Sequence, residues 1–296
     1  MNEKFQEIEE IIEKYTKAGE ILSEVRSEAK DKVHVGASLL EVAEFVEQRS
    51  VELGGQPAFP CNISRNDEAA HATPSKGDES VFGKDMVKID LGVHIDGYIA
   101  DSAFTVDLSG NPDLVKASED ALAAAIDVIK SGVNTAKIGG VIEDAITGYG
   151  FKPIMNLTGH GLARYITHAS PTIPNRHIDH GVILEEGEVI AIEPFATDGA
   201  GKIADGSWAE IYHVIGSRPV RLPAARKLMK ELEQYETLPF AKRWLSSERL
   251  DITMFQLERA GVIASYPVLK EVAGGLVSQA EHTVIVTDDG CEVITK

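Results

Sequence analysis

Residues 86–106 read MVKIDLGVHIDGYIADSAFTV, and the rest of the chain is arranged around this stretch. Two runs rich in β-forming residues meet at Asp96-Gly97, a dipeptide that favours a two-residue hairpin turn. Such a turn pairs Ile95 with Tyr98 and thereby fixes the register of both strands. The stretch therefore predicts a long antiparallel hairpin.

One face of this hairpin carries two carboxylates. In the predicted register Asp90 lies opposite Ala103. Asp101 lies opposite Gly92, and because side chains alternate along a strand, all four share one face. The two aspartates are then diagonal neighbours, with backbones about 7–8 Å apart. They repel each other and lose solvation, and no lysine or arginine lies among the central pairs of this face, so we favour a metal site over a single solvated aspartate.

The composition is that of an ordinary globular protein with an acidic surface. The 296 residues are 43% hydrophobic and 26% charged, enough for a large core. A formal net charge of −18 argues against broad binding to nucleic-acid phosphates. Two cysteines, Cys61 and Cys291, are too few for a disulfide framework or a thiolate metal site. The first residues are polar and acidic, and no apolar run reaches membrane-spanning length, so we expect a cytoplasmic protein.

Two pairs of amphipathic helices indicate an internal repeat. Apolar residues recur at helical spacing over 5–29, and a second helix is predicted from Ser38, which can cap it, to Gly54. Further along, helices are predicted over 112–130 and 135–147. An offset of 96 residues aligns the apolar positions and closing glycine of the second helix with those of the fourth. We expect two related halves, each with two helices followed by strands.

A helical segment interrupts the second half. Residues 219–261 show helical spacing, including a run over 240–245. The last strands are expected over 277–287 and 291–295. We therefore expect an inserted helical subdomain, residues 219–265, within a main domain of residues 1–218 plus 266–296.

Three further groups lie in apolar or glycine-rich surroundings. Glu193 ends VIAIE and Glu281 begins EHTVIV, both read as buried strands, where an unpaired carboxylate is costly. His160 lies in LTGHG, between glycines that allow close backbone approach. Each alone is better explained as a solvated edge or loop residue. Together with the two aspartates they form an oxygen-rich set that suits a pair of divalent first-row ions, which would acidify a bridging water.

Longer motifs around these residues resemble those of type 2 methionine aminopeptidases in their short archaeal form. The matching stretches cover essentially the whole chain: AFP (58–60), AAHATP (69–74), KIDLGVHIDGYIADSAFT (88–105), NLTGHGLARYITHASPTIPN (156–175), IAIEPFAT (190–197), SYPVL (265–269) and QAEHT (279–283). The resemblance implies an α+β pita-bread fold with a pseudo-twofold internal repeat, whose main domain is catalytic. It also implies removal of N-terminal methionine from nascent polypeptides, with a preference for a small second residue.

By the same resemblance, five residues would hold two divalent ions (Co, Mn, Fe(II) or Zn): Asp90, Asp101, His160, Glu193 and Glu281. The catalytic residues would be Glu193, His168 and His71. Glu193 would pass a proton from the water to the leaving amine. His168 would hydrogen-bond the carbonyl of the cleaved bond, as in an oxyanion hole, and His71 would contact the substrate backbone. The substrate would lie against Phe59, His71, Tyr266 and His168, with Thr167 at the rim of the methionine pocket. The role of His94 is left open.

Two other readings share this fold. Xaa-Pro aminopeptidases and prolidases use a similar ligand set but usually carry an extra N-terminal domain, for which this chain has no room. A non-catalytic relative that binds protein or RNA would have lost metal ligands, and here all five are present. The resemblance implies nascent polypeptides as partners, with no specific nucleic acid and no membrane, and leaves contact with the ribosome open. We expect a monomer.

Overall fold

The computed structural model describes residues 2–220, 222–247 and 249–296. Residues 1, 221 and 248 fall within the predicted domain ranges but lie outside the described residues. The helices are α1 (Asn2–Lys30), α2 (Leu39–Glu52), α3 (Pro112–Val128), α4 (Thr135–Gly148), α5 (Pro223–Leu232) and α6 (Leu250–Arg259), with 3₁₀ turns η1 (Glu233–Tyr235) and η2 (Lys242–Trp244). None of the helices described is both long and apolar enough to cross a bilayer.

The described strands form five sheets, two of them large. One large sheet contains β1 (Gln56–Pro57), β2 (Asn62–Arg65), β4 (Met86–Ile95) and β5 (Tyr98–Asp107). The other has the order β18 (Cys291–Val293), β17 (His282–Val286), β9 (Val189–Ile192), β7 (Thr158–Ala163) and β8 (Ile166–Pro174). The small sheets are β16 (Val277–Gln279) with β10 (Phe195–Thr197) and β6 (Lys152–Pro153); β11 (Ile203–Asp205) with β15 (Leu269–Glu271) and β3 (Glu68–Ala70); and β13 (Phe240–Ala241) with β12 (Ile211–Val214) and β14 (Ile263–Tyr266).

The central hairpin has the predicted register. β4 and β5 pair antiparallel along their whole lengths, with Asp90 opposite Ala103. Asp96 and Gly97 form the turn with φ of 50° and 87°, the left-handed region that glycine adopts freely and aspartate tolerates. The prediction made from Asp96-Gly97 is therefore confirmed.

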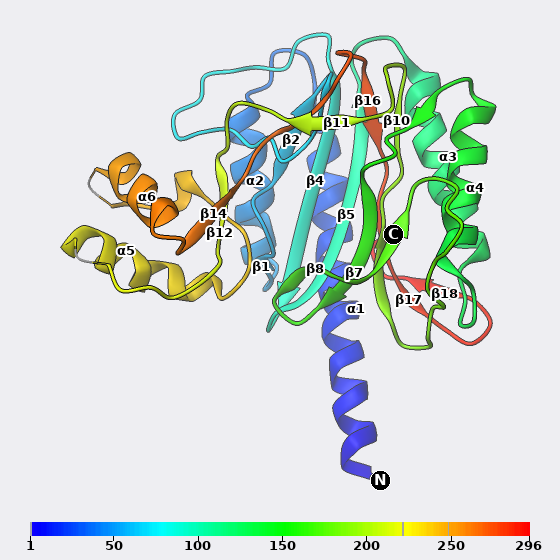
Figure 1. The fold of residues 1–296 in the computed structure, drawn as a ribbon, viewed down its shortest axis with the longest axis horizontal. Helices are drawn as coiled ribbons and strands as arrows, with labels where there is room; N and C mark the ends of the chain where they lie inside the picture. The colour runs from blue at the N-terminus through cyan, green and yellow to red at the C-terminus, as the bar shows by residue number, and fades with distance from the viewer. Residues whose placement is uncertain (1, 221, 248) are drawn as a thin grey trace.

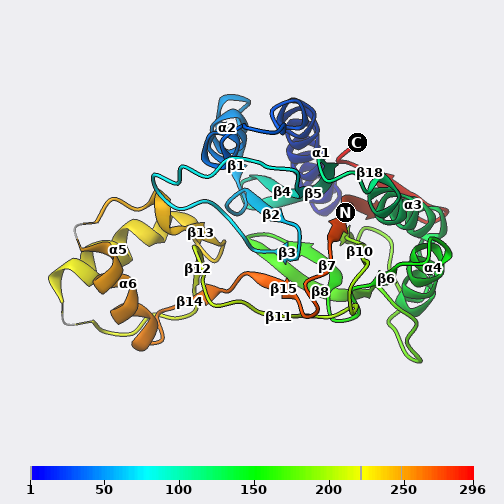
Figure 2. The same cartoon turned by 90° about the horizontal axis from the view of Figure 1, so that it is seen from above.

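Helices cover the two halves in pairs. Figure 2 shows α1 and α2 beside β4 and β5, and α3 and α4 together at the end of the molecule opposite α5 and α6. Ile89 and Leu91 of β4 are fully buried in the core formed with α1 and α2, and each such side chain contributes about 1.5–3 kcal/mol. A second core joins α3 and α4 to β9 and β17. Each half thus has its own apolar core.

The repeat is visible in the helix ends. α2 and α4 begin 96 residues apart and also end 96 residues apart, as the predicted offset requires. Ser38 caps α2 through its hydroxyl, and Asn134 caps α4 through its side-chain oxygen. The glycines that follow, Gly54 and Gly150, both have positive φ, which ends each helix in the same way.

The segment that was predicted as an inserted helical subdomain lies at the end of the molecule away from α3 and α4 (Figure 1). α5 and α6 pack around an apolar cluster of their own that includes Leu228, Phe240 and Leu257. The predicted helix over 240–245 is wrong in part, because Phe240–Ala241 pairs with β12 as strand β13 and only Lys242–Trp244 turns as a 3₁₀ helix. Pairing with β12 favours a strand at Phe240–Ala241 despite the helical spacing of the apolar residues.

Candidate metal and substrate site

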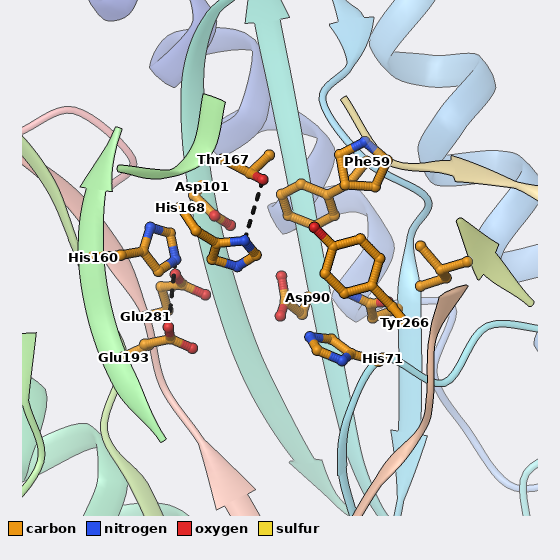
Figure 3. A pocket seen from close by; sticks show the side chains of 13 residues that line it. Phe59, His71, Asp90, Asp101, His160, Thr167, His168, Glu193, Tyr266 and Glu281 are labelled. Carbon is orange, nitrogen blue, oxygen red and sulfur yellow. Dashed lines mark hydrogen bonds and ion pairs between the residues drawn. The ribbon is translucent and has the colours of Figure 1, made fainter. Parts of the chain in front are cut away.

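All of the predicted site residues line a single pocket (Figure 3): Phe59, His71, Asp90, Asp101, His160, Thr167, His168, Glu193, Tyr266 and Glu281. Asp101, His160, Glu193 and Glu281 lie on one side, and the aromatic side chains of Phe59 and Tyr266 lie on the other. Asp90 and His168 lie between the two groups. The pocket therefore has a polar half and an apolar half.

The central hairpin supplies two of the acids. Asp90 comes from β4 and Asp101 from β5, in the diagonal arrangement that the sequence predicts. The backbone at Asp101 is held by Thr283, whose hydroxyl accepts from the Asp101 N–H at 2.8 Å and donates to its carbonyl at 2.7 Å. β17 thus fixes the position from which this carboxylate enters the pocket.

The other two acids lie at interruptions in paired strands. β9 pairs with β17, and β10 pairs with β16 in the same register, so Glu193 and Glu281 lie opposite each other at the gap between the two ladders. The single strand predicted over 277–287 is wrong at this gap. There the Glu281 N–H donates instead to the carbonyl of Ala103 at 3.0 Å. The break brings both carboxylates into the pocket.

His160 completes the polar half. Its Nε2 lies 3.4 Å from Oε1 of Glu193. Asp101, His160 and Glu281 each offer a ligand atom, and these three atoms all lie within 4.8 Å of one another. Carboxylate oxygen with imidazole nitrogen is a donor set suited to divalent first-row ions.

The acids are held where their charges need a counter-ion. Burial raises the pKa of Asp90 to about 7. Burial, and after it the neighbouring carboxylates, raise the pKa values of Asp101, Glu193 and Glu281 well above their usual range. Oδ1 of Asp90 and Oδ1 of Asp101 have no hydrogen-bond partner among the described residues. Bound cations would interact with these unpartnered buried oxygens and neutralise the clustered carboxylates. The donor set therefore fits divalent metal ions.

Two polar residues beside the acids were missed by the sequence reading. Nε2 of Gln279 donates to Oδ2 of Asp90 at 3.3 Å and to Oε2 of Glu281 at 3.4 Å, which orients both carboxylates. Lys88 precedes Asp90 by two residues and is fully buried. Its ammonium donates to the carbonyl of Asn66 at 3.0 Å rather than to the carboxylates. For Lys88 the available signal was a charged residue among the apolar residues of β4, whereas the short strand Val277–Gln279 gives no such signal for Gln279.

Two of the pocket histidines are neutral near pH 7. Burial lowers the pKa of His71 to about 4 and that of His160 to about 3, and repulsion from the positive charge that His168 can carry is the second cause for both. Nδ1 of His71 lies 3.3 Å from the carbonyl of Pro267. A carbonyl only accepts, so the proton is on Nδ1 and Nε2 of His71 is free to accept.

The apolar half is built around two aromatic rings. Tyr266 lies edge-on to His71, with ring centroids 5.3 Å apart, and 4.6 Å from the ring of His213. Ile211 and Pro239 also line this pocket. No motif marks Ile211, Pro239 or His213, and only the packing of β12, β13 and β14 brings the first two to the pocket and His213 against Tyr266.

His94 is not among the residues that line this pocket. Its Nδ1 accepts from the backbone N–H of Gly97 at 3.0 Å, and its ring lies edge-on to Tyr165. His94 shares a face of β4 with Asp90, but its contacts are with the hairpin turn and with Tyr165.

Comparisons with known proteins agree with this geometry. The model of metallopeptidase family M24 matches residues 13–288. The methionine aminopeptidase of Archaeoglobus fulgidus is 56% identical and spans 97% of this chain and 99% of its own length. The methionine aminopeptidase of Methanocaldococcus jannaschii is 50% identical and spans 96% of this chain and 98% of its own length. A solved methionine aminopeptidase from Thermotoga maritima, 24% identical, superposes with a TM-score of 0.72 over 96% of both chains, which confirms the predicted α+β pita-bread fold.

Proposed function

This chain belongs to the methionine aminopeptidases of metallopeptidase family M24, and we propose that it is a type 2 member that removes N-terminal methionine from nascent polypeptides. One observation carries this proposal: His160 and three carboxylates lie on one side of a pocket whose other side is apolar, with Asp90 between the two sides. The first side suits hydrolysis with bound metal ions, and the second suits a methionine side chain.

The assignment to type 2 is supported by the long stretch between Glu193 and Glu281. α5 and α6 lie in that stretch, with an apolar cluster of their own. We also propose the corresponding division into a catalytic domain, residues 1–218 plus 266–296, and an inserted helical subdomain, residues 219–265.

We propose that the polar half holds two divalent ions. Asp90 would bind one ion, His160 and Glu193 would bind the other, and Asp101 and Glu281 would lie between them. Four carboxylate charges balance two dications, and oxygen-rich ligands suit Mn, Fe(II), Co or Zn. When bound, such ions polarise a carbonyl and lower the pKa of a water molecule, which supplies the nucleophile at neutral pH.

The remaining polar groups would position the substrate and move its proton. Glu193 lies beside His160 and would take a proton from the attacking water and deliver it to the leaving amine. His168, between the acids and Tyr266, would donate to the oxygen of the cleaved carbonyl as negative charge develops there. His71, with Nε2 free to accept, suits an N–H of the substrate backbone.

The apolar half accounts for the choice of methionine. Phe59, Tyr266 and Thr167 would surround a flexible thioether, which packs well against aromatic rings. We further propose a preference for a small second residue, and action as a cytoplasmic monomer on nascent chains. An Xaa-Pro peptidase is not favoured, because the relatives at 46–56% identity are methionine aminopeptidases.

Peptide turnover across metals tests the proposal. The purified chain would be stripped of metal, reconstituted anaerobically with Mn, Fe(II), Co or Zn, and assayed on Met-Ala-Ser, Met-Leu-Ser, Ala-Ala-Ser and an Xaa-Pro peptide, with metal content measured alongside. We expect Met-Ala-Ser to be cleaved best and activity to follow metal content up to two ions per chain. Cleavage confined to Xaa-Pro peptides, or no cleavage with any metal, would contradict it.

A further inference from the structure

Outside the pocket, a buried ion pair joins segments that are distant in sequence. Arg243 of η2, whose side chain is 3% exposed, pairs with Glu47 of α2. Nη1 of Arg243 also donates to the hydroxyl of Thr73 at 2.8 Å and to the carbonyl of Pro74 at 3.1 Å. The Thr73 hydroxyl in turn donates to the carbonyl of Cys61 at 2.7 Å. The guanidinium of Arg243 therefore connects η2 to α2 and to the loop at Thr73–Pro74, and through Thr73 to the loop at Cys61.

The carboxylate of Glu47 is used on both of its oxygens. Oε1 accepts from Arg243 and from the backbone N–H of Cys61, the latter at 3.1 Å. Oε2 accepts from the indole N–H of Trp244 at 2.8 Å. A buried ion pair repays its desolvation only when its other hydrogen-bonding positions are filled, and here most of them are. Removal of one partner leaves the other buried and uncompensated.

Three of the segments held by this network carry residues that line the pocket. Phe59 lies two residues before Cys61, and His71 lies two residues before Thr73. Pro239 precedes β13, which leads directly into η2. Side chains from three parts of the sequence thus reach the pocket from anchor points that share one ion pair.

His71 needs such an anchor for its own conformation. Its φ is 65°, a left-handed conformation that costs a residue with a Cβ about 1–2 kcal/mol. A strained residue at a site persists only where its surroundings hold it. The hydrogen bond from Nδ1 to Pro267 holds its ring, and the bonds made by Thr73 hold the backbone that follows.

We propose that Arg243 and Glu47 are positioning residues for the methionine pocket, holding Phe59, His71 and Pro239 at the spacing that the substrate requires. Neither Arg243 nor Glu47 lines the pocket. The inference rests on the proposed function and deepens it, since it makes selectivity for methionine depend on contact between α2 and the inserted segment.

Two variants and a matched control test this inference. Arg243→Met removes every donor and keeps an unbranched, though shorter, side chain, and Glu47→Gln keeps the shape but loses the charge and one acceptor. Arg49→Met is the control, because Arg49 also lies on α2 and pairs with Glu24 at 2.8 Å and Glu28 at 2.9 Å, away from the pocket. For Met-Ala-Ser we expect kcat/KM to fall by about 100-fold in Arg243→Met, since small misplacements of positioning groups cost that much. The control should stay near wild type.

The measurements separate positioning from a purely structural role. We expect the ratio of kcat/KM for methionine over norleucine at the first position to shrink in both variants, with a larger change in KM than in kcat. Metal affinity measured by calorimetry should stay unchanged, because none of the proposed metal ligands is bonded to Arg243 or Glu47. Arg243→Lys, which keeps the charge, should recover part of the selectivity.

Each outcome decides between the alternatives. Folded variants with wild-type selectivity and kcat/KM would overturn the inference while the wild type remains an active methionine aminopeptidase. If Arg243→Met does not fold, Glu47→Gln decides alone, and unchanged selectivity in it overturns the inference. A wild type inactive on Met-Ala-Ser with every metal would overturn the proposed function, and this inference with it.

Discussion

Asp101 lies directly opposite Gly92 in the β4–β5 ladder. Glycine presents no side chain toward this carboxylate, and the ring of Phe59 occupies the space that a Cβ at Gly92 would need. The polar half and the apolar half of the pocket therefore meet at one glycine. A larger residue at position 92 would change the apolar half of the pocket, where we propose that methionine binds, and would leave all four carboxylates in place.

Gly92→Ala should impair substrate binding. The added methyl group would collide with the ring of Phe59, which lines the pocket and must shift, and such overpacking costs about 1–3 kcal/mol. We expect a higher KM for methionine peptides with metal content unchanged, measured by steady-state kinetics. Gly148→Ala in α4, where a Cβ meets no atom within 4 Å, is the matched control. Equal kinetics in the two variants would contradict the packing argument.

Asp101→Asn should abolish turnover without unfolding the protein. The amide has the size of the carboxylate, and the Thr283 bonds to the backbone of residue 101 are unaffected. Because one of four mutually repelling buried acids becomes neutral, the metal-free variant should be at least as stable as the metal-free wild type. Circular dichroism with thermal melting would check stability, and metal analysis should find fewer bound ions. Retained activity at full metal content would remove Asp101 from the proposed ligand set.

The fold could be predicted where local chemistry decides it. Asp96-Gly97 sets the hairpin register through turn geometry alone, and Ser38 marks a helix start because its hydroxyl caps a backbone N–H. Glu193 and Glu281 were candidates because a carboxylate in an apolar run needs a partner, but only the longer motifs around them distinguished them from solvated edge residues. These signals lie within a few residues of the feature that they predict.

What the sequence did not predict depends on contacts between distant segments. Phe240 forms a strand because β12 lies beside it, and the break at Glu281 exists because Ala103 offers a carbonyl there. Ile211 and Pro239 enter the pocket only after β12 and β13 pair. None of these positions carries a local signal that distinguishes it from an ordinary core residue.

Removal of metal should lower stability, and addition should restore it in a concentration-dependent way. A ligand that binds only the folded state stabilises it by about 2.7 kcal/mol at 100 times its Kd. For a chain of 296 residues we expect a rise in melting temperature of roughly 4 °C on titrating Mn or Co into the metal-free protein. The same titration of Asp101→Asn should give a smaller rise. An unchanged melting temperature in the wild type would argue against metal binding by the cluster of acids.

Glu271, which does not line the pocket, allows a test of how stability depends on pH. Its carboxylate, in a residue only 3% exposed, accepts four backbone N–H groups: Ala200 at 2.6 Å, Gly201 at 3.2 Å, Ala273 at 2.7 Å and Gly275 at 3.0 Å. Burial opposes ionisation, but these donors outweigh it and hold the pKa of Glu271 below its usual value. The carboxylate thereby joins two loops.

Glu271→Gln should cost about 1–3 kcal/mol at pH 7, because an amide group turns its own N–H toward some of these donors. Since the folded pKa lies below the unfolded one, the unfolded chain binds more protons in that window and the stability contribution disappears as pH falls through the folded value. The difference in unfolding free energy between wild type and variant should therefore be full at pH 7 and shrink below about pH 4, near the unfolded pKa of a glutamate. Urea titrations of both proteins at several pH values measure it, and titration of the other acids cancels in the difference. A difference that stays constant down to pH 3 would show that the charge of Glu271 does not hold the two loops together.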